Sequence, residues 1–136
     1  MSLMLSEKEF GKYLNKNANG HHFELGKSLI SVNIVHATPV MSCLYLGESF
    51  FFAARYNQQY GVFTDPLLIE RKQIVSTVIH TKLMNAELQV QTNLPIAKDS
   101  KDCLELKMNI SKLTPVKWHK ENLKTLSQRE EFVEKS

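Results

Sequence analysis

A succession of short apolar segments separated by turn residues runs from Leu29 to Ile110, and it constrains the fold more than any other feature of the sequence. Several segments alternate apolar and polar residues, which is the period of a strand with one buried face. Gly47-Glu48 and Asp65-Pro66 favour turns, and we expect a bend near Lys72-Gln73. The segments predict strands at 29–36, 41–46, 49–56, 62–64, 67–71, 74–81, 86–92 and 103–110.

A helix is predicted before the strands, over residues 7–17. Ser6 stands where an N-cap is expected, and Glu9 three residues later completes the pattern of a capping box. Leu5 and Phe10 occupy the two positions of a hydrophobic staple, which packs the incoming chain against the helix. Asn17 marks the end of the helix, because Asn tolerates the left-handed conformation found there.

A second helix is predicted after the strands, over residues 115–133. Pro115 suits the first helical position, because it has no N–H to leave unpaired. Val116, Leu123 and Leu126 fall on one side of this helix, and Trp118 lies at the margin of that side. The helix is therefore expected to pack one broad face on an apolar surface.

These elements predict a mostly β, α+β fold in a single domain of residues 1–136. An antiparallel sheet of six to seven strands over about 23–110 has two edges to protect, and curling into a bent, partly open β-barrel protects them. The C-terminal helix would then cap the open end, with Val116, Trp118, Leu123 and Leu126 as its core. A chain of 136 residues with 43% hydrophobic content suits one core of this size.

Charge and hydrophobicity argue against two classes of partner. The 17 basic and 14 acidic residues give a net charge of +3 and are spread along the chain, whereas nucleic-acid binding needs a concentrated basic face. No apolar run approaches the roughly 20 residues that span a bilayer, and the first residues lack the pattern of a signal peptide. We expect a cytoplasmic protein with no integral membrane segment and no nucleic-acid partner.

No pattern in the sequence is typical of a catalytic or metal site. His21 and His22 are adjacent, so on a strand they would point to opposite sides, and no third ligand stands at a suitable spacing. Cys43 and Cys103 each lie in an apolar alternating segment, which favours two buried free thiols, although a disulfide between them stays open. We expect no catalytic residue and no metal.

The densest apolar feature is the aromatic run Phe50-Phe51-Phe52, followed by Tyr56. Three successive residues of a strand cannot all face one side of a sheet. At least one Phe is therefore expected to point outward or into a contact with another chain. This reasoning predicts a partner-binding strip formed by Phe50, Phe51, Phe52 and Tyr56.

The middle of the chain resembles bacterial pleckstrin-homology-like domains over about Leu44–Leu126. In those domains a Gly-Glu pair precedes one strand, a Thr-Asp pair with two apolar residues follows the next strand, and a further strand carries two spaced, branched apolar residues. The stretches "LGESFFFAARYNQQYGVFTDPLLIE" and "QIVSTV" are similar to these motifs and follow the same order. The resemblance implies a bent barrel of seven strands closed by a C-terminal helix that carries a tryptophan. Pro66 departs from this pattern, because a basic residue usually follows the Thr-Asp pair.

Some relatives in that superfold bind phosphoinositides through Lys and Arg gathered in the loop after the first strand. Several cations must converge on such a headgroup to offset its lost hydration. Arg71-Lys72 is the only adjacent basic pair in the barrel region of this sequence. Phosphoinositide binding is therefore not expected here.

The leading functional prediction is a non-enzymatic binding or scaffold domain that acts through protein–protein contacts or self-association. A free edge strand could pair with a second copy or accept a peptide as an added strand. The alternative is a flavin (FMN)-binding split-barrel protein, possibly an oxidoreductase, in which Arg55 and Lys72 would meet the flavin phosphate. Lys8, Lys12 and Lys16 form a basic stripe on the first helix that could also attach to a membrane surface.

Overall fold

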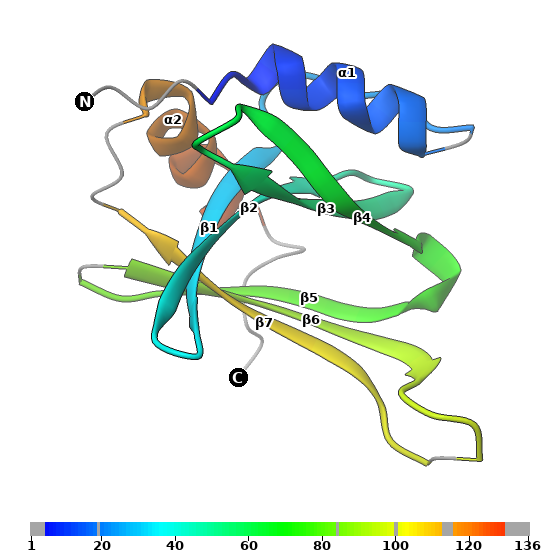
Figure 1. Ribbon diagram of the computed structural model, residues 1–136. Helices are drawn as coiled ribbons and strands as arrows, with labels where there is room; N and C mark the ends of the chain where they lie inside the picture. The colour runs from blue at the N-terminus through cyan, green and yellow to red at the C-terminus, as the bar shows by residue number, and fades with distance from the viewer. Residues whose placement is uncertain (1–4, 19, 84, 100, 113–115, 130–136) are drawn as a thin grey trace.

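The structure is a computed structural model that describes residues 5–18, 20–83, 85–99, 101–112 and 116–129 (Figure 1). It contains two antiparallel sheets, of strand order β1-β2-β3-β4 and β5-β6-β7, and two α-helices. The elements are α1 (Glu7–Asn17), β1 (Ser28–Val35), β2 (Thr38–Leu46), β3 (Phe50–Asn57), β4 (Val62–Glu70), the 3₁₀ helix η1 (Arg71–Gln73), β5 (Ile74–Thr81), β6 (Asn85–Pro95), β7 (Cys103–Ser111) and α2 (Lys117–Ser127).

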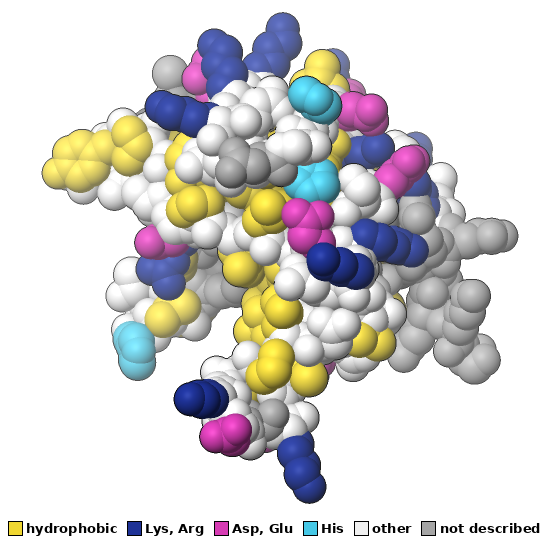
Figure 2. Space-filling model, turned by 90° about the vertical axis from the view of Figure 1, so that its right-hand side faces the viewer, with side chains coloured by type: hydrophobic (Ala, Val, Ile, Leu, Met, Phe, Trp, Pro, Cys, Tyr) yellow, Lys and Arg dark blue, Asp and Glu magenta, His cyan; other side chains and the backbone are white. Residues whose placement is uncertain are grey.

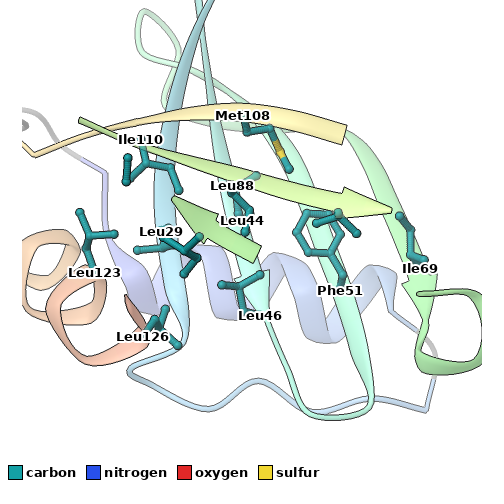
Figure 3. Close-up of a cluster of buried hydrophobic side chains, with 13 residues drawn as sticks. Leu29, Leu44, Leu46, Phe51, Ile69, Leu88, Met108, Ile110, Leu123 and Leu126 are labelled. Atoms are coloured by element: carbon teal, nitrogen blue, oxygen red, sulfur yellow. The ribbon is translucent and has the colours of Figure 1, made fainter. Parts of the chain in front are cut away.

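The elements form layers. Figure 1 shows the three-stranded sheet below the four-stranded sheet, α1 across the top of the four-stranded sheet, and α2 at one end beside β1. Buried side chains gather in two clusters, one between the two sheets and one between the upper sheet and α1. Figure 3 shows the cluster between the sheets, to which α2 and every strand from β1 to β7 contribute. The fold is therefore α+β and mostly β.

The predicted barrel is wrong, because the described strands pair into two separate sheets and do not close. Between β4 and β5 the chain turns through η1, so these two strands do not pair. The edge strands β1 and β7 of the two sheets also lie side by side, but hydrogen bonds that involve side chains join them instead of a backbone ladder. The Asn109 backbone N–H donates to Asn33 Oδ1 at 2.9 Å, and Asn109 Nδ2 donates to the Val32 carbonyl at 3.3 Å.

A second correction concerns β4, which was expected as two strands broken at Asp65-Pro66. The strand continues from Val62 to Glu70. Asp65 takes a left-handed backbone conformation (φ 53°) opposite a shift in register between Ala53 and Arg55. Asp tolerates this conformation, and Pro66 is accommodated because β4 is an edge strand, where a missing N–H need not break the ladder.

The N-terminal helix follows its sequence signals closely. Ser6 is the N-cap residue, and its Oγ accepts a hydrogen bond from the Glu9 N–H at 3.4 Å. Leu5 and Phe10 are both buried in the cluster beneath the helix. Gly11 allows close packing, because a Cβ at this position would lie 2.4 Å from the Phe23 ring. The helix ends at Asn17, as predicted.

The C-terminal helix divides its apolar residues between the two clusters. Leu123 and Leu126 lie in the cluster between the sheets, near Leu29 and Ile110 (Figure 3). Val116 is buried in the other cluster, and Trp118 packs against that cluster. The predicted first helical residue Pro115 and the predicted helical residues 130–133 lie outside the described part of the chain. Within the described part, no helix is long and apolar enough to cross a membrane.

Candidate functional site

The predicted aromatic strip is not a surface. Phe50, Phe51, Phe52 and Tyr56 are between 0 and 8% exposed. Phe51 points between the two sheets, while the other three lie in the cluster beneath α1. The expectation that at least one Phe faces outward or another chain is therefore wrong, because α1 covers the second face of the sheet.

The two cysteines are free, and they lie in opposite environments. Cys43 is fully buried in β2, where burial, with a smaller contribution from the negative charge of Glu7, raises the pKa of its thiol far above the ordinary range. Cys103, which was expected to be buried, is exposed at the start of β7. The burial of Cys43 is the opposite of the electropositive, partly exposed setting that activates a thiol nucleophile.

We expect an alkylating reagent to modify Cys103 quickly in the native protein and to modify Cys43 only after unfolding, because a thiolate must form and be reached for reaction. Intact-mass spectrometry after iodoacetamide treatment, with and without denaturant, measures both rates. Cys103→Ser should abolish native labelling, whereas Cys43→Ser should leave it unchanged. Fast double labelling of the native protein would contradict the burial of β2.

Two histidines have specific partners in the structure. His119 is fully buried on α2, and its Nδ1 accepts a hydrogen bond from the Ile30 N–H at 2.9 Å. His21 Nε2 lies 2.9 Å from Glu70 Oε2, and its ring stacks on Phe50. Among the described residues, no group of three or more His, Cys, Asp and Glu is placed to hold a metal ion.

The flavin alternative drew on Arg55 and Lys72. Arg55 lines a hollow of about 610 Å³ to which all four strands of the four-stranded sheet contribute, and its Nε lies 3.8 Å from the Asp65 carboxylate. Lys72 lies in η1 and does not line this hollow. The two cations do not share a site, and the FMN hypothesis stays a prediction that an absorbance spectrum of the purified protein can test.

Side chains cover the edge of β1. Asn122 Nδ2 donates to the Ser28 carbonyl at 3.0 Å, while His119 accepts from Ile30 and Asn109 donates to Val32. These contacts satisfy backbone groups that an edge strand otherwise presents to other chains. This role of His119 and Asn122 could not be predicted from the sequence, because their partners lie far away along the chain.

The next two edges are protected in other ways. β4 carries Pro66, the charged Asp65 and a register shift near its middle, all of which hinder the addition of another strand. β7 lies against β1 through the Asn109 contacts. These two edges are therefore poor templates for another strand.

The remaining edge belongs to β5, and apart from a register shift near Ile74 it has none of these protections. Six of its eight residues are β-branched, and none is Pro, Lys, Arg, Asp or Glu. β6 is the only described element that runs alongside it, and no described side chain hydrogen-bonds its outer edge between Ile74 and Ile79. A register shift lies near Ile74, and pairing is regular from Ser76 to Thr81. The open edge of β5 is the candidate binding site.

The side chains of β5 alternate between two faces. Ile79 pairs with Leu88 and is buried between the sheets, so Val78, which pairs with Gln89, lies on the outer face. Val75 is 65% exposed. An added strand would therefore meet free backbone groups together with uncharged side chains.

A second exposed apolar region lies at the end of the molecule away from α2. Figure 2 views this end and shows hydrophobic side chains in a band down its centre. The margin of the cluster between the sheets is formed by partly buried side chains of five strands: Ala53, Leu67, Ile74, Leu94, Leu104 and Leu106. Ile74 at the start of β5 belongs to this margin.

In the described part of the chain, the fold and the site define a two-sheet α+β protein with one open sheet edge. Comparisons with protein-family models, with curated proteins and with solved structures found no match for this chain.

Proposed function

We propose that this protein is a non-enzymatic binding module that self-associates by pairing β5 of two copies. The observation that carries the proposal is the contrast among the described edges: β1, β4 and β7 are covered, bulged or charged, whereas β5, apart from the register shift near Ile74, is not. Unpaired strands with uncharged, β-branched residues readily pair with another strand. A second copy supplies a matching strand by symmetry.

The sequence of β5 is compatible with antiparallel pairing about a twofold axis. A register centred on Val78 places Val78 opposite Val78 of the second copy, and Thr77 opposite Ile79 of the second copy. No like charges meet in this register. The residue numbers of paired positions differ by an even amount in this register. The core-facing side chains of both copies therefore lie on the same face of the extended sheet.

The order of strands and helices along the chain also supports a binding module, because it agrees with the resemblance seen in the sequence. Seven strands followed by a final helix are the order of elements that the resemblance implies, although the strands form two sheets here instead of a barrel. We propose membership of that superfold. Domains of this kind commonly work as binding modules, and fold alone does not name the partner.

Val78→Lys tests the proposal. The wild-type protein is expected to form a dimer that dissociates on dilution, because the paired surface is small. Val78→Lys places two ammonium groups opposite each other and should weaken the dimer by about tenfold or more, which corresponds to ~1.4 kcal/mol. Sedimentation velocity over a concentration series measures the change.

Val62→Lys is the matched control. Val62 is partly exposed on the edge strand β4, so the substitution adds the same charge to the edge of the other sheet. It should leave the dimer unchanged. A wild-type protein that stays monomeric at its highest attainable concentration, or a dimer equally weakened by both substitutions, would refute pairing through β5.

A further inference from the structure

A hollow of about 330 Å³ lies between α2 and the ends of the lower sheet, and it is independent of the β5 edge proposal. Its lining consists of Thr81, Lys112, Lys120, Leu123, Lys124 and Ser127. These residues come from the end of β5, the segment after β7, and α2. Figure 1 shows α2, the β5–β6 turn and the end of β7 at the same end of the molecule. We call this hollow the lysine pocket.

Three ammonium groups line the lysine pocket, and none of its described lining residues carries a carboxylate. Lys120 and Lys124 are four residues apart on one face of α2, where like charges repel. Their helix neighbour Glu121 lies instead by Lys117, with 4.0 Å between Nζ and Oε1. Within the described residues, Lys112, Lys120 and Lys124 form no ion pair. An anion between them would relieve the repulsion.

The other lining groups suit an anion with several oxygens. Lys112 Nζ donates to the Lys82 carbonyl, which ties Lys112 to the β5–β6 turn. The Thr81 hydroxyl is exposed at the pocket and can donate, while Ser127 Oγ donates to the Lys124 carbonyl. Buried Leu123 is the one apolar lining residue.

The C-terminal end of α2 also contributes to the charge of the pocket. The C-terminal end of a helix carries a partial negative charge of about half a unit, which opposes an anion and stabilises a nearby cation such as Lys124. Three full positive charges exceed this partial charge. Attraction would therefore come from the lysine side chains rather than from the helix.

We propose that the lysine pocket binds a small phosphate-bearing anion with more than one negative charge. Lysine binds phosphate as a point charge, and such contacts are charge-assisted hydrogen bonds. The volume of the hollow is near the lower end of the range for small-molecule sites, which suits one or two phosphate groups. Nucleic acid would need a basic track along the surface, and this pocket is a single local hollow.

Inorganic pyrophosphate is the probe, and the variant is Lys120→Gln with Lys124→Gln. Titration calorimetry at fixed ionic strength should show saturable binding to the wild-type protein. The double variant should bind about tenfold or more weakly, because each charge-assisted contact contributes on the order of a factor of ten. In a ¹⁵N NMR titration, the amides of Thr81, Leu123 and Ser127 should shift in the wild-type protein.

Lys8→Gln with Lys16→Gln is the matched control, since it removes two charges from exposed positions on the other helix. This variant should bind pyrophosphate like the wild-type protein. The proposal would be overturned if no protein showed saturable pyrophosphate binding, or if both double variants lost the same amount of pyrophosphate affinity.

Vesicles distinguish a free phosphate from a lipid phosphate. Phosphatidylcholine vesicles with and without phosphatidic acid are sedimented with each protein. Binding that requires phosphatidic acid and is lost only in the α2 double variant supports the pocket with a lipid source. Pyrophosphate binding without vesicle binding supports a soluble source. Vesicle binding that survives the α2 substitutions, without pyrophosphate binding, contradicts the pocket.

Discussion

Phe51→Ala is expected to lower the free energy of unfolding by about 3–5 kcal/mol, because the substitution leaves a cavity where a phenyl ring was packed. Phe51 is 1% exposed and lies between the sheets near Ile69 and Leu46 (Figure 3). Urea denaturation followed by circular dichroism measures the loss. The partner-strip hypothesis gives the opposite expectation, an unchanged fold with weakened binding.

Tyr60→Ala is the control for Phe51→Ala. Tyr60 is also aromatic, but it is 71% exposed in the β3–β4 turn. Surface substitutions of this kind usually change stability by less than about 0.5 kcal/mol. If Phe51→Ala cost no more than Tyr60→Ala, the ring would not be part of the packed core.

Asn122→Asp is expected to destabilise the fold by about 3–5 kcal/mol at neutral pH. Asn122 Nδ2 donates to Glu7 Oε2 and to the Ser28 carbonyl, each at 3.0 Å, and both Asn122 and Glu7 are buried. An aspartate at this position would lose both donations and bring a second negative charge beside Glu7. Unpaired buried charge is among the most costly changes that a single substitution makes.

Chemical denaturation at neutral and at acidic pH measures this effect. The difference from the wild-type protein should shrink as the pH falls, because a protonated carboxyl can donate again. Asn17→Asp is the control, since Asn17 is an exposed residue of α1 that donates only to the Tyr13 carbonyl. Equal effects of the two substitutions would mean that the contacts of Asn122 do not hold α2 in place.

Local signals predicted the elements well. The helix from Glu7 to Asn17 depends on contacts within one turn, such as the Ser6 cap, and these can be read from neighbouring residues. The strand at 74–81 also agrees with the structure. The break at Asp65-Pro66 failed because tolerance of Pro depends on whether a strand lies at an edge, and that property belongs to the sheet.

Tertiary arrangement was less accessible. The alternation argument for the aromatic run was correct in requiring two faces, but sequence could not show that α1 covers the second face through Phe10. Likewise, a barrel and a pair of sheets share the same strand pattern. In a closed barrel, β4 would pair with β5, and β1 would pair with β7 through backbone hydrogen bonds. In the structure, β4 and β5 do not pair, and Asn109 of β7 bonds to the side chain of Asn33 in β1.

The lysine pocket and the open edge of β5 could be recognised only in the three-dimensional structure. Lys112, Lys120 and Lys124 are not adjacent in the sequence, and Lys117, which lies between the first two, does not line the pocket, so no basic run marks them. The uncharged composition of β5 was visible, but a central strand has the same composition. What distinguishes β5 is its position in the sheet order, which sequence reasoning did not assign.

The contacts from α2 to β1 affect how the protein is made on the ribosome. Ile30 and His119 are 89 positions apart, so the bond between them cannot form until α2 has been synthesised and released from the exit tunnel. At about 5–20 residues per second, the nascent β1 spends several seconds without its cover. During translation, β1 is therefore a second place where chains can stick together, and nascent-chain binding by a chaperone should be strongest before residue 119 emerges.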